Sequence, residues 1–248
     1  MTDRWRVFAN LATLANALLG VGAILYILAG NKLWAMLLIA SAIGFDGLDG
    51  IFSRRSRRPG TTFGRVADSV ADAITFGAAP AFLLAVHTSD PGVWQPVETY
   101  ALVVAAAYLT AAVARLVYFT ARAYTRSDFL GVPTPQSALA VIVAILFHDT
   151  PAFQTPQPIG LFVGAAALAL WMVLPIPYPK IRRGAPLRWP MVGTAIAAAV
   201  ALTLLQFHPA SGTVVYSVAL VASYALLVGV AVYYVVGPFT VKRKAAEG

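Results

Sequence analysis

Four aspartates are grouped in segments that are otherwise apolar enough to enter a bilayer. Of the 10 acidic residues in this 248-residue sequence, Asp46, Asp49, Asp68 and Asp72 lie close together along the chain. A carboxylate at membrane depth costs at least a few kcal/mol, so four of them need compensating cations. Mg²⁺ and Mn²⁺ prefer carboxylate oxygens and complete their shells with water and phosphate oxygens. The group therefore predicts a site for one or two divalent ions and phosphate chemistry at a membrane surface.

Each aspartate pair has the spacing of one helix face, three residues in the first pair and four in the second. A glycine lies four residues away, on the side nearer to the connecting loop, where a missing side chain lets a bulky ligand approach the backbone. The residues concerned are Asp46, Asp49 and Gly50 in the first segment and Gly64, Asp68 and Asp72 in the second. Cations suited to phosphate lie at the entrance: Arg54, Arg55, Arg57, Arg58 and Arg65.

The composition indicates in which class of protein these residues lie. The chain is 59% hydrophobic and 11% charged, with a mean hydropathy of +0.75, whereas soluble domains carry about 25% charged residues. Apolar runs of membrane-spanning length recur, so we expect an all-α, polytopic integral-membrane helical bundle that forms one domain over residues 1–248. We read the first run as a retained helix, and the lack of cysteine excludes thiolate metal sites. About eight transmembrane helices are expected, at residues 7–29, 33–52, 66–87, 97–119, 134–148, 157–174, 189–207 and 214–236.

The basic residues predict the orientation of these helices. All of the 18 Lys and Arg residues except Lys32 fall on one side of the eight-helix arrangement. By the positive-inside rule that side is the cytoplasm, so both termini and the aspartates face it in the plasma membrane. The deepest carboxylates lie about 12 Å of helix below the loop between the second and third helices. The net charge of +8 is explained by topology and attraction to anionic headgroups, without nucleic acid.

The aspartates belong to a longer pattern that carries a family resemblance. The pattern Asp46-x2-Asp49-Gly50-x2-Ser53-Arg54-x9-Gly64-x3-Asp68-x3-Asp72 resembles the signature of the CDP-alcohol phosphatidyltransferases, with Ser53 in place of the usual Ala. The resemblance implies displacement of CMP from a CDP-linked lipid by an alcohol, at a site with two Mg²⁺ or Mn²⁺ ions, in a homodimer. It implies metal binding by Asp46, Asp49, Asp68 and Asp72, proton abstraction by Asp72, and contact with the CDP moiety by Gly50, Arg54 and Gly64.

The flanking sequence is similar to the phosphatidylserine and archaetidylserine synthase branch of that family. Four stretches carry the similarity: Thr13 and Asn16 as a T-x2-N element, residues 75–81 (TFGAAPA), residues 129–135 (FLGVPTP), and Met172-Val173 with Ile176 and Tyr178-Pro179-Lys180. The similarity implies L-serine as the acceptor and CDP-diacylglycerol or CDP-archaeol as the lipid donor. Thr13 and Asn16 are expected to contact the CDP-lipid.

The residues that would bind the acceptor are less clearly marked. Tyr118 and Thr120 stand where that branch often has Arg and Asn in the pattern R-L-x-R-F-N. Cations that remain for a serine carboxylate are Arg115, Arg126, Lys180 and Arg182. Arg115 can also be an interface anchor whose charge reaches the headgroups, and a juxtamembrane Arg126 is expected from topology alone.

Alternatives remain open from the sequence. Another alcohol, such as glycerol phosphate or an inositol phosphate, can serve as acceptor in the same reaction. A cation-coupled transporter also uses buried carboxylates, although it would favour broken helices and mid-bilayer acids. His87, His148 and His208 fall at the non-cytoplasmic ends of the expected helices, share no metal-ligand spacing, and are expected to be interface residues.

Overall fold

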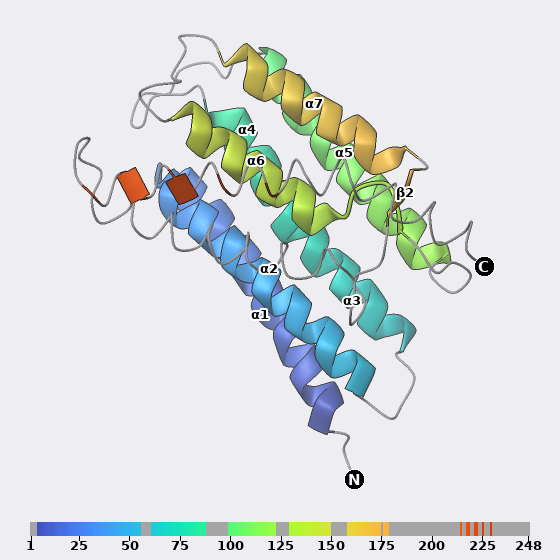
Figure 1. Cartoon of the computed structure of the whole chain (residues 1–248). Coiled ribbons are helices and arrows are strands. Elements are labelled where there is room, and N and C mark those ends of the chain that lie inside the picture. The colour runs from blue at the N-terminus through green and yellow to red at the C-terminus, as the bar shows by residue number, and fades with distance from the viewer. Residues whose placement is uncertain are drawn as a thin grey trace.

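The computed structural model describes residues 4–55, 61–87, 99–122, 129–149, 158–174 and 176–178, with isolated helical positions between 214 and 229. The described part is a bundle of helices with one short strand pair (Figure 1). The elements are α1 (Arg4–Leu28), α2 (Lys32–Arg55), α3 (Thr62–Asp72), η1 (Ala73–Ala78), α4 (Ala79–Val86), α5 (Thr99–Arg122), β1 (Phe129–Leu130), α6 (Thr134–His148), α7 (Ile159–Val173) and β2 (Pro177–Tyr178).

Helices α1 and α2 form an antiparallel pair joined by a tight turn. Gly30 ends α1 with a positive φ of 77°, a conformation that glycine adopts without a steric penalty. Asn31 then begins α2, because its side-chain Oδ1 accepts a hydrogen bond from the backbone N–H of Trp34 at 3.2 Å. The pair therefore runs side by side along one flank of the bundle (Figure 1).

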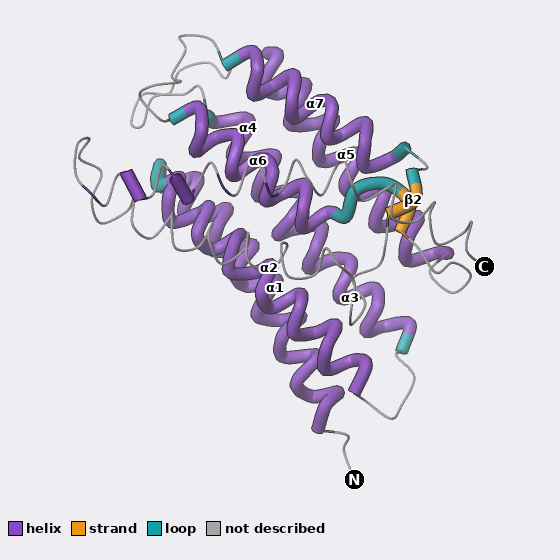
Figure 2. The backbone as a smooth tube through the Cα atoms, in the orientation of Figure 1, coloured by secondary structure: helices purple, strands orange, loops and turns teal. Residues whose placement is uncertain are grey.

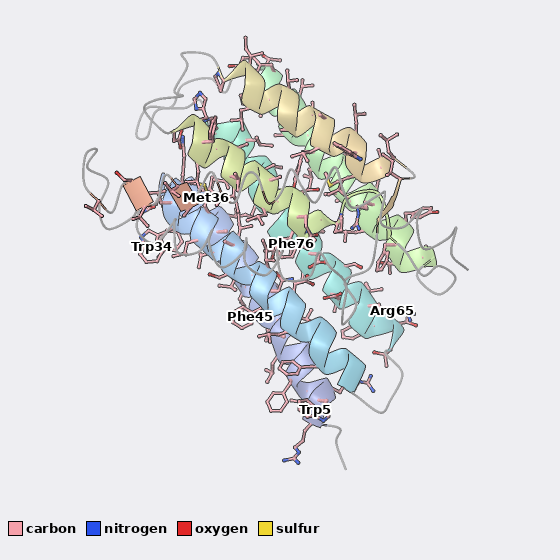
Figure 3. The ribbon with its side chains drawn as sticks, viewed as in Figure 1. Trp5, Trp34, Met36, Phe45, Arg65 and Phe76 are labelled. Carbon is pink, nitrogen blue, oxygen red and sulfur yellow. The ribbon has the colours of Figure 1, made fainter. Side chains whose placement is uncertain are left out.

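Aromatic side chains lie at both ends of the α1–α2 pair. Trp5 stacks on Phe52 near one end, and Tyr26 stacks on Trp34 near the other. Figure 3 shows Trp5 and Trp34 at opposite ends of the pair. Tryptophan is enriched where a membrane meets water, so this arrangement is the one expected of helices that cross a bilayer.

Three of the described helical segments are long and apolar enough to cross a membrane: Arg4–Leu28, Thr62–Val86 and Thr99–Ala121. They coincide within a few residues with the first, third and fourth segments expected from the sequence. Helices α2, α6 and α7 coincide in the same way with the second, fifth and sixth segments. The seventh expected segment, 189–207, lies outside the described residues, as does most of 214–236. The helical architecture is thus confirmed, whereas the count of eight spans stays a prediction.

Segment Thr62–Val86 contains a turn of π-helix, η1, between α3 and α4. Pro80 has no N–H to donate to the carbonyl of Phe76, four residues earlier. The fully buried Tyr108 of α5 supplies a side-chain donor to this carbonyl, since its hydroxyl donates to the Phe76 carbonyl oxygen at 3.1 Å. Figure 3 shows Phe76 at the centre of the bundle, directly beyond α3. Wider turns of this kind are frequent at functional sites, and this one follows Asp72 immediately.

The strand pair joins two stretches that resemble the serine synthase branch. Strands β1 and β2 pair in antiparallel register, Phe129 with Tyr178 and Leu130 with Pro177 (Figure 2). Gly131 follows with φ 69°, and its N–H donates to the Ile176 carbonyl at 2.8 Å. A Cβ on Gly131 would lie 2.8 Å from the Met172 carbonyl carbon, so only glycine fits. This close contact fixes the start of α6 against the end of α7.

Candidate functional site

Three of the four signature carboxylates meet between α2 and α3. Asp46 comes from α2, and Asp68 and Asp72 come from α3; one carboxylate oxygen of each lies within 4.8 Å of the others. Asp46 and Asp68 are half-buried, and Asp72 is buried. The spacing that predicted one helix face for Asp68 and Asp72 is confirmed, because both reach the same point. Asp49 lies one turn after Asp46 on α2, and its side chain is outside the described part of the structure.

The glycines and Arg54 of the signature lie at the ends of the same two helices. Gly50 is a half-exposed residue of α2, and Arg54 is in its last turn, with a side chain outside the described part. Gly64 is in the first turn of α3, where its N–H donates to Thr61 Oγ1 at 3.1 Å and so caps the helix. A Cβ on Gly64 would meet that hydroxyl at 3.3 Å. Their expected contact with a CDP moiety remains a prediction.

Helix α1 supplies the residue that orients Asp72. The fully buried Asn16 donates from Nδ2 to Asp72 Oδ1 at 2.9 Å. Thr75 of η1 fixes Asn16 in turn, because its hydroxyl donates to the Asn16 backbone carbonyl at 2.9 Å. Gly20, one turn after Asn16, permits this approach: a Cβ there would lie 2.8 Å from the Thr75 Cα. The sequence singled out Asn16 and Thr75 by resemblance but gave Gly20 no role.

Thr13, the other member of the T-x2-N element, is half-buried, and its hydroxyl donates to the Ala9 carbonyl of its own helix at 3.2 Å. A pair of hydrogen-bonded hydroxyls lies between α3 and α5, formed by Ser69 and Thr120. Ser69 is between Asp68 and Asp72 in sequence, and Thr120 occupies one of the two positions that depart from the serine synthase pattern. The structure therefore gives this departure a local partner.

Arg115 of α5 lies inside the bundle. It is buried, and its Nη1 donates to Thr134 Oγ1 at the start of α6, at 2.8 Å. Its charge is within electrostatic range of the Asp72 carboxylate. A buried guanidinium bound to a buried hydroxyl does not match an interface anchor, whose charge would reach the headgroups. Arg126, Lys180 and Arg182, the other expected acceptor-binding residues, lie outside the described residues.

The donor set fits a divalent metal of the Mg²⁺ or Mn²⁺ kind. Asp46, Asp68 and Asp72 present three hard oxygen donors at one point. Asn16 adds a fourth oxygen nearby: its Oδ1 is buried and has no hydrogen-bond partner in the part of the chain that the structure describes. Carboxylate and amide oxygens are the ligands expected for Mg²⁺ and Mn²⁺ and poor ones for softer metals.

Comparison with known proteins matches this site and its surroundings. The sequence model of the family described as CDP-alcohol phosphatidyltransferase matches residues 6–177, a range that includes the carboxylates, Asn16 and Arg115. A CDP-diacylglycerol–serine O-phosphatidyltransferase of Helicobacter pylori (strain J99) is 29% identical over 182 residues, 71% of this chain and 73% of that protein.

Two further relatives come from distant organisms. The enzyme of the same name from Bacillus subtilis (strain 168) is 27% identical over 176 residues, 70% of this chain and 90% of that one. The archaetidylserine synthase of Methanothermobacter thermautotrophicus is 27% identical over 173 residues, 69% of each chain.

Proposed function

We propose that this chain, which belongs to the CDP-alcohol phosphatidyltransferase family, transfers a phosphatidyl or archaetidyl group from a CDP-linked lipid to the hydroxyl of L-serine and releases CMP. Membership of the family makes it an enzyme of phospholipid synthesis, and this displaces the transporter alternative. The observation that carries the proposal is the meeting of Asp46, Asp68 and Asp72 beside Asn16.

We assign metal binding to Asp46, Asp49, Asp68 and Asp72, with Mg²⁺ or Mn²⁺ as the ion and two ions as the number. The family is generally dependent on divalent metals, and the grouped carboxylates support the same dependence here. Bound cations of this kind neutralise a pyrophosphate and stabilise the charge that develops on the transferring phosphoryl group.

The protein's own contribution to the step is positioning and proton transfer. The serine oxygen forms a bond to the lipid-linked phosphorus, the bond from this phosphorus to the bridging oxygen breaks, and CMP leaves with the electron pair. The hydroxyl proton passes to the carboxylate of Asp72. Asn16 restrains rotation of that carboxylate by its hydrogen bond to Oδ1, so the same oxygen faces the acceptor in each cycle. Gly50, Arg54, Gly64, Thr13 and Asn16 border the CDP-lipid in this proposal.

Serine is favoured over other alcohols by two considerations. The relatives named above are serine and archaetidylserine synthases by name. Arg115 is a buried cation near Asp72, and a guanidinium binds a carboxylate well at a desolvated site. The amino acid would bring both the reacting hydroxyl and a carboxylate for Arg115.

The deciding experiment follows CMP release by the purified full chain with CDP-diacylglycerol or CDP-archaeol and Mn²⁺ or Mg²⁺. L-serine should release CMP, and glycerol 3-phosphate and inositol phosphate should release little. If only another alcohol releases CMP, that alcohol would replace serine as the proposed acceptor, and the proposed type of reaction would stay the same. Asp72→Asn should lower turnover by at least about 100-fold, the usual contribution of a general base, while CDP-lipid binding remains. Near-normal turnover in that variant would remove Asp72 from its role.

We also propose the finer membrane arrangement: one domain over residues 1–248, eight spans, cytoplasmic termini and a cytoplasmic active site in the plasma membrane. The distribution of Lys and Arg supports it. Because the chain has no cysteine, single introduced cysteines can report on which side of the membrane a residue lies. Ala29→Cys, in the exposed α1–α2 turn, should react with an impermeant maleimide in intact cells, and Arg243→Cys only after permeabilisation. The reverse pattern would invert the topology.

A homodimer is the assembly that the family resemblance implies, and we propose it for this chain. The mass of the protein in detergent, corrected for bound detergent, tests it directly. A monomer mass in active preparations would overturn this part of the proposal.

A further inference from the structure

A second group of metal-ligating side chains lies where α4 and α6 end. His87 directly follows α4, His148 is the last residue of α6, and Asp149 follows it. The sequence separates the two histidines by 61 residues, so it showed no ligand spacing. The structure brings them together: His87 Nε2 lies 3.0 Å from His148 Nδ1, with the rings edge to face. The two histidines expected as interface residues therefore lie against each other at the ends of their helices, and His208 lies outside the described residues.

The three donor atoms form a triangle of the right size for one ion. Asp149 Oδ1 lies 3.7 Å from His87 Nε2 and 3.6 Å from His148 Nδ1. A tetrahedral zinc site has metal–donor bonds of about 2.0–2.1 Å, which separates its donors by about 3.3 Å. A single point about 2 Å from all three atoms exists for the observed edges. The three atoms are therefore spaced closely enough to share one metal ion.

From this geometry we propose that His87, His148 and Asp149 bind a Zn²⁺-type transition-metal ion that ties the end of α4 to the end of α6. Two imidazoles and one carboxylate are a common protein set for Zn²⁺ and suit it better than Mg²⁺ or Mn²⁺. The fourth position is left for water.

Burial and solvent access are both compatible with an ion bound at this point. The His87 side chain is 2% exposed and that of His148 16%, whereas Asp149 is 45% exposed and gives the ion a route from solvent. Lys32 places an adverse charge near His87, and its Nζ donates to the His87 backbone carbonyl at 2.9 Å. The Asp149 carboxylate, 3.7 Å from His87 Nε2, offsets that charge.

This site is separate from the carboxylate site. His87 directly follows the helical segment Thr62–Val86 and comes 15 residues after Asp72, which is about 22 Å along the helix. Figure 1 shows α4 and α6 reaching the end of the bundle opposite to the start of α3. The helical segment Thr62–Val86 also contains Asp72, and α6 begins at Thr134, whose hydroxyl accepts a hydrogen bond from Arg115. An ion that holds the far ends of α4 and α6 would fix the register of the two elements that position these groups.

The test uses Co²⁺, which absorbs visible light strongly in a tetrahedral site, in excess Mg²⁺ that occupies oxygen sites. The full chain is purified in detergent through a tag without histidine and titrated with Co²⁺ and then Zn²⁺. One equivalent of Co²⁺ should give tetrahedral absorption that Zn²⁺ abolishes, and Zn²⁺ should raise the Tm.

His148→Gln and Asp149→Asn, at the more exposed positions, should weaken Co²⁺ binding at least tenfold and remove the Zn²⁺-dependent rise in Tm. Asp46→Asn is the matched control in the carboxylate site and should keep the absorption. If the wild-type chain binds neither ion in excess Mg²⁺, or if His148→Gln binds Co²⁺ as the wild type does, the histidines form only a hydrogen-bonded pair and the proposal is wrong.

Discussion

The side-chain amide of Asn16 donates to Asp72 Oδ1 at 2.9 Å across 56 residues of sequence. Both groups are buried, and the bond joins the first helix to the helix that carries two signature carboxylates. Thr75 holds the backbone of Asn16 by a second hydrogen bond from η1. The orientation of Asp72 therefore depends on how closely α1 packs against η1, and two predictions follow from that dependence.

Asn16→Ala should lower kcat by about 10- to 100-fold, the usual effect of removing a group that orients a ligand or base. The KM for CDP-lipid should change less, because the carboxylates themselves remain. Asn16→Asp should be worse than Asn16→Ala, since it adds a negative charge beside Asp72. Steady-state CMP release measures kcat and the KM for CDP-lipid in the wild type and in both variants. Leu14→Ala, an exposed position on the same helix, is the control and should be unchanged. Equal kcat in Asn16→Ala and wild type would assign the bond to structure alone.

Gly20→Ala should destabilise the protein and lower activity together. Its Cβ would press on the Thr75 backbone, and overpacking of this kind costs about 1–3 kcal/mol. The helices must move apart, which lengthens the Asn16–Asp72 bond. Gly164→Ala on α7, where a Cβ would meet nothing within 4 Å, is the matched control. Thermal unfolding in detergent and CMP release are the measurements, and a Gly20→Ala variant with unchanged Tm and rate would contradict the close packing.

Tyr108→Phe should lower the free energy of unfolding by about 1–3 kcal/mol, the cost of leaving a buried carbonyl without its donor. The carbonyl is that of Phe76, which Pro80 cannot satisfy. Tyr100→Phe on the same helix is the control, because Tyr100 is exposed. Adding Pro80→Ala to Tyr108→Phe restores an N–H and should recover part of the loss. If the double variant is no more stable than Tyr108→Phe, the hydroxyl does not replace the proline's missing donor.

The sequence predicted those features that helical periodicity and helix length determine. Asp68 and Asp72 share a face because they are four residues apart, and a short loop makes α2 and α3 neighbours, so Asp46 could be placed beside them. Apolar run length located α6 at its observed bounds. The hydrogen bond that the Tyr108 hydroxyl donates to the Phe76 carbonyl in the π-helical turn could not be foreseen, because the two residues are 32 positions apart in sequence. The meeting of His87 and His148 depends on packing across 61 residues, which no local pattern encodes.

Arg115→Ala should raise the KM for serine by at least about tenfold, since a hydrogen bond to a charged group contributes about 1.5–3 kcal/mol and 1.4 kcal/mol is a factor of ten. The KM for CDP-lipid should change much less. Arg115→Lys keeps the charge but loses the bidentate geometry of the guanidinium, so we expect an intermediate KM for serine. Thr134→Val removes the hydroxyl that receives Arg115 Nη1 and should shift the serine KM in the same direction by a smaller factor. Initial rates with each substrate varied in turn provide the comparison. Equal increases in both KM values would mean that Arg115 supports the fold of the site and does not bind the serine carboxylate.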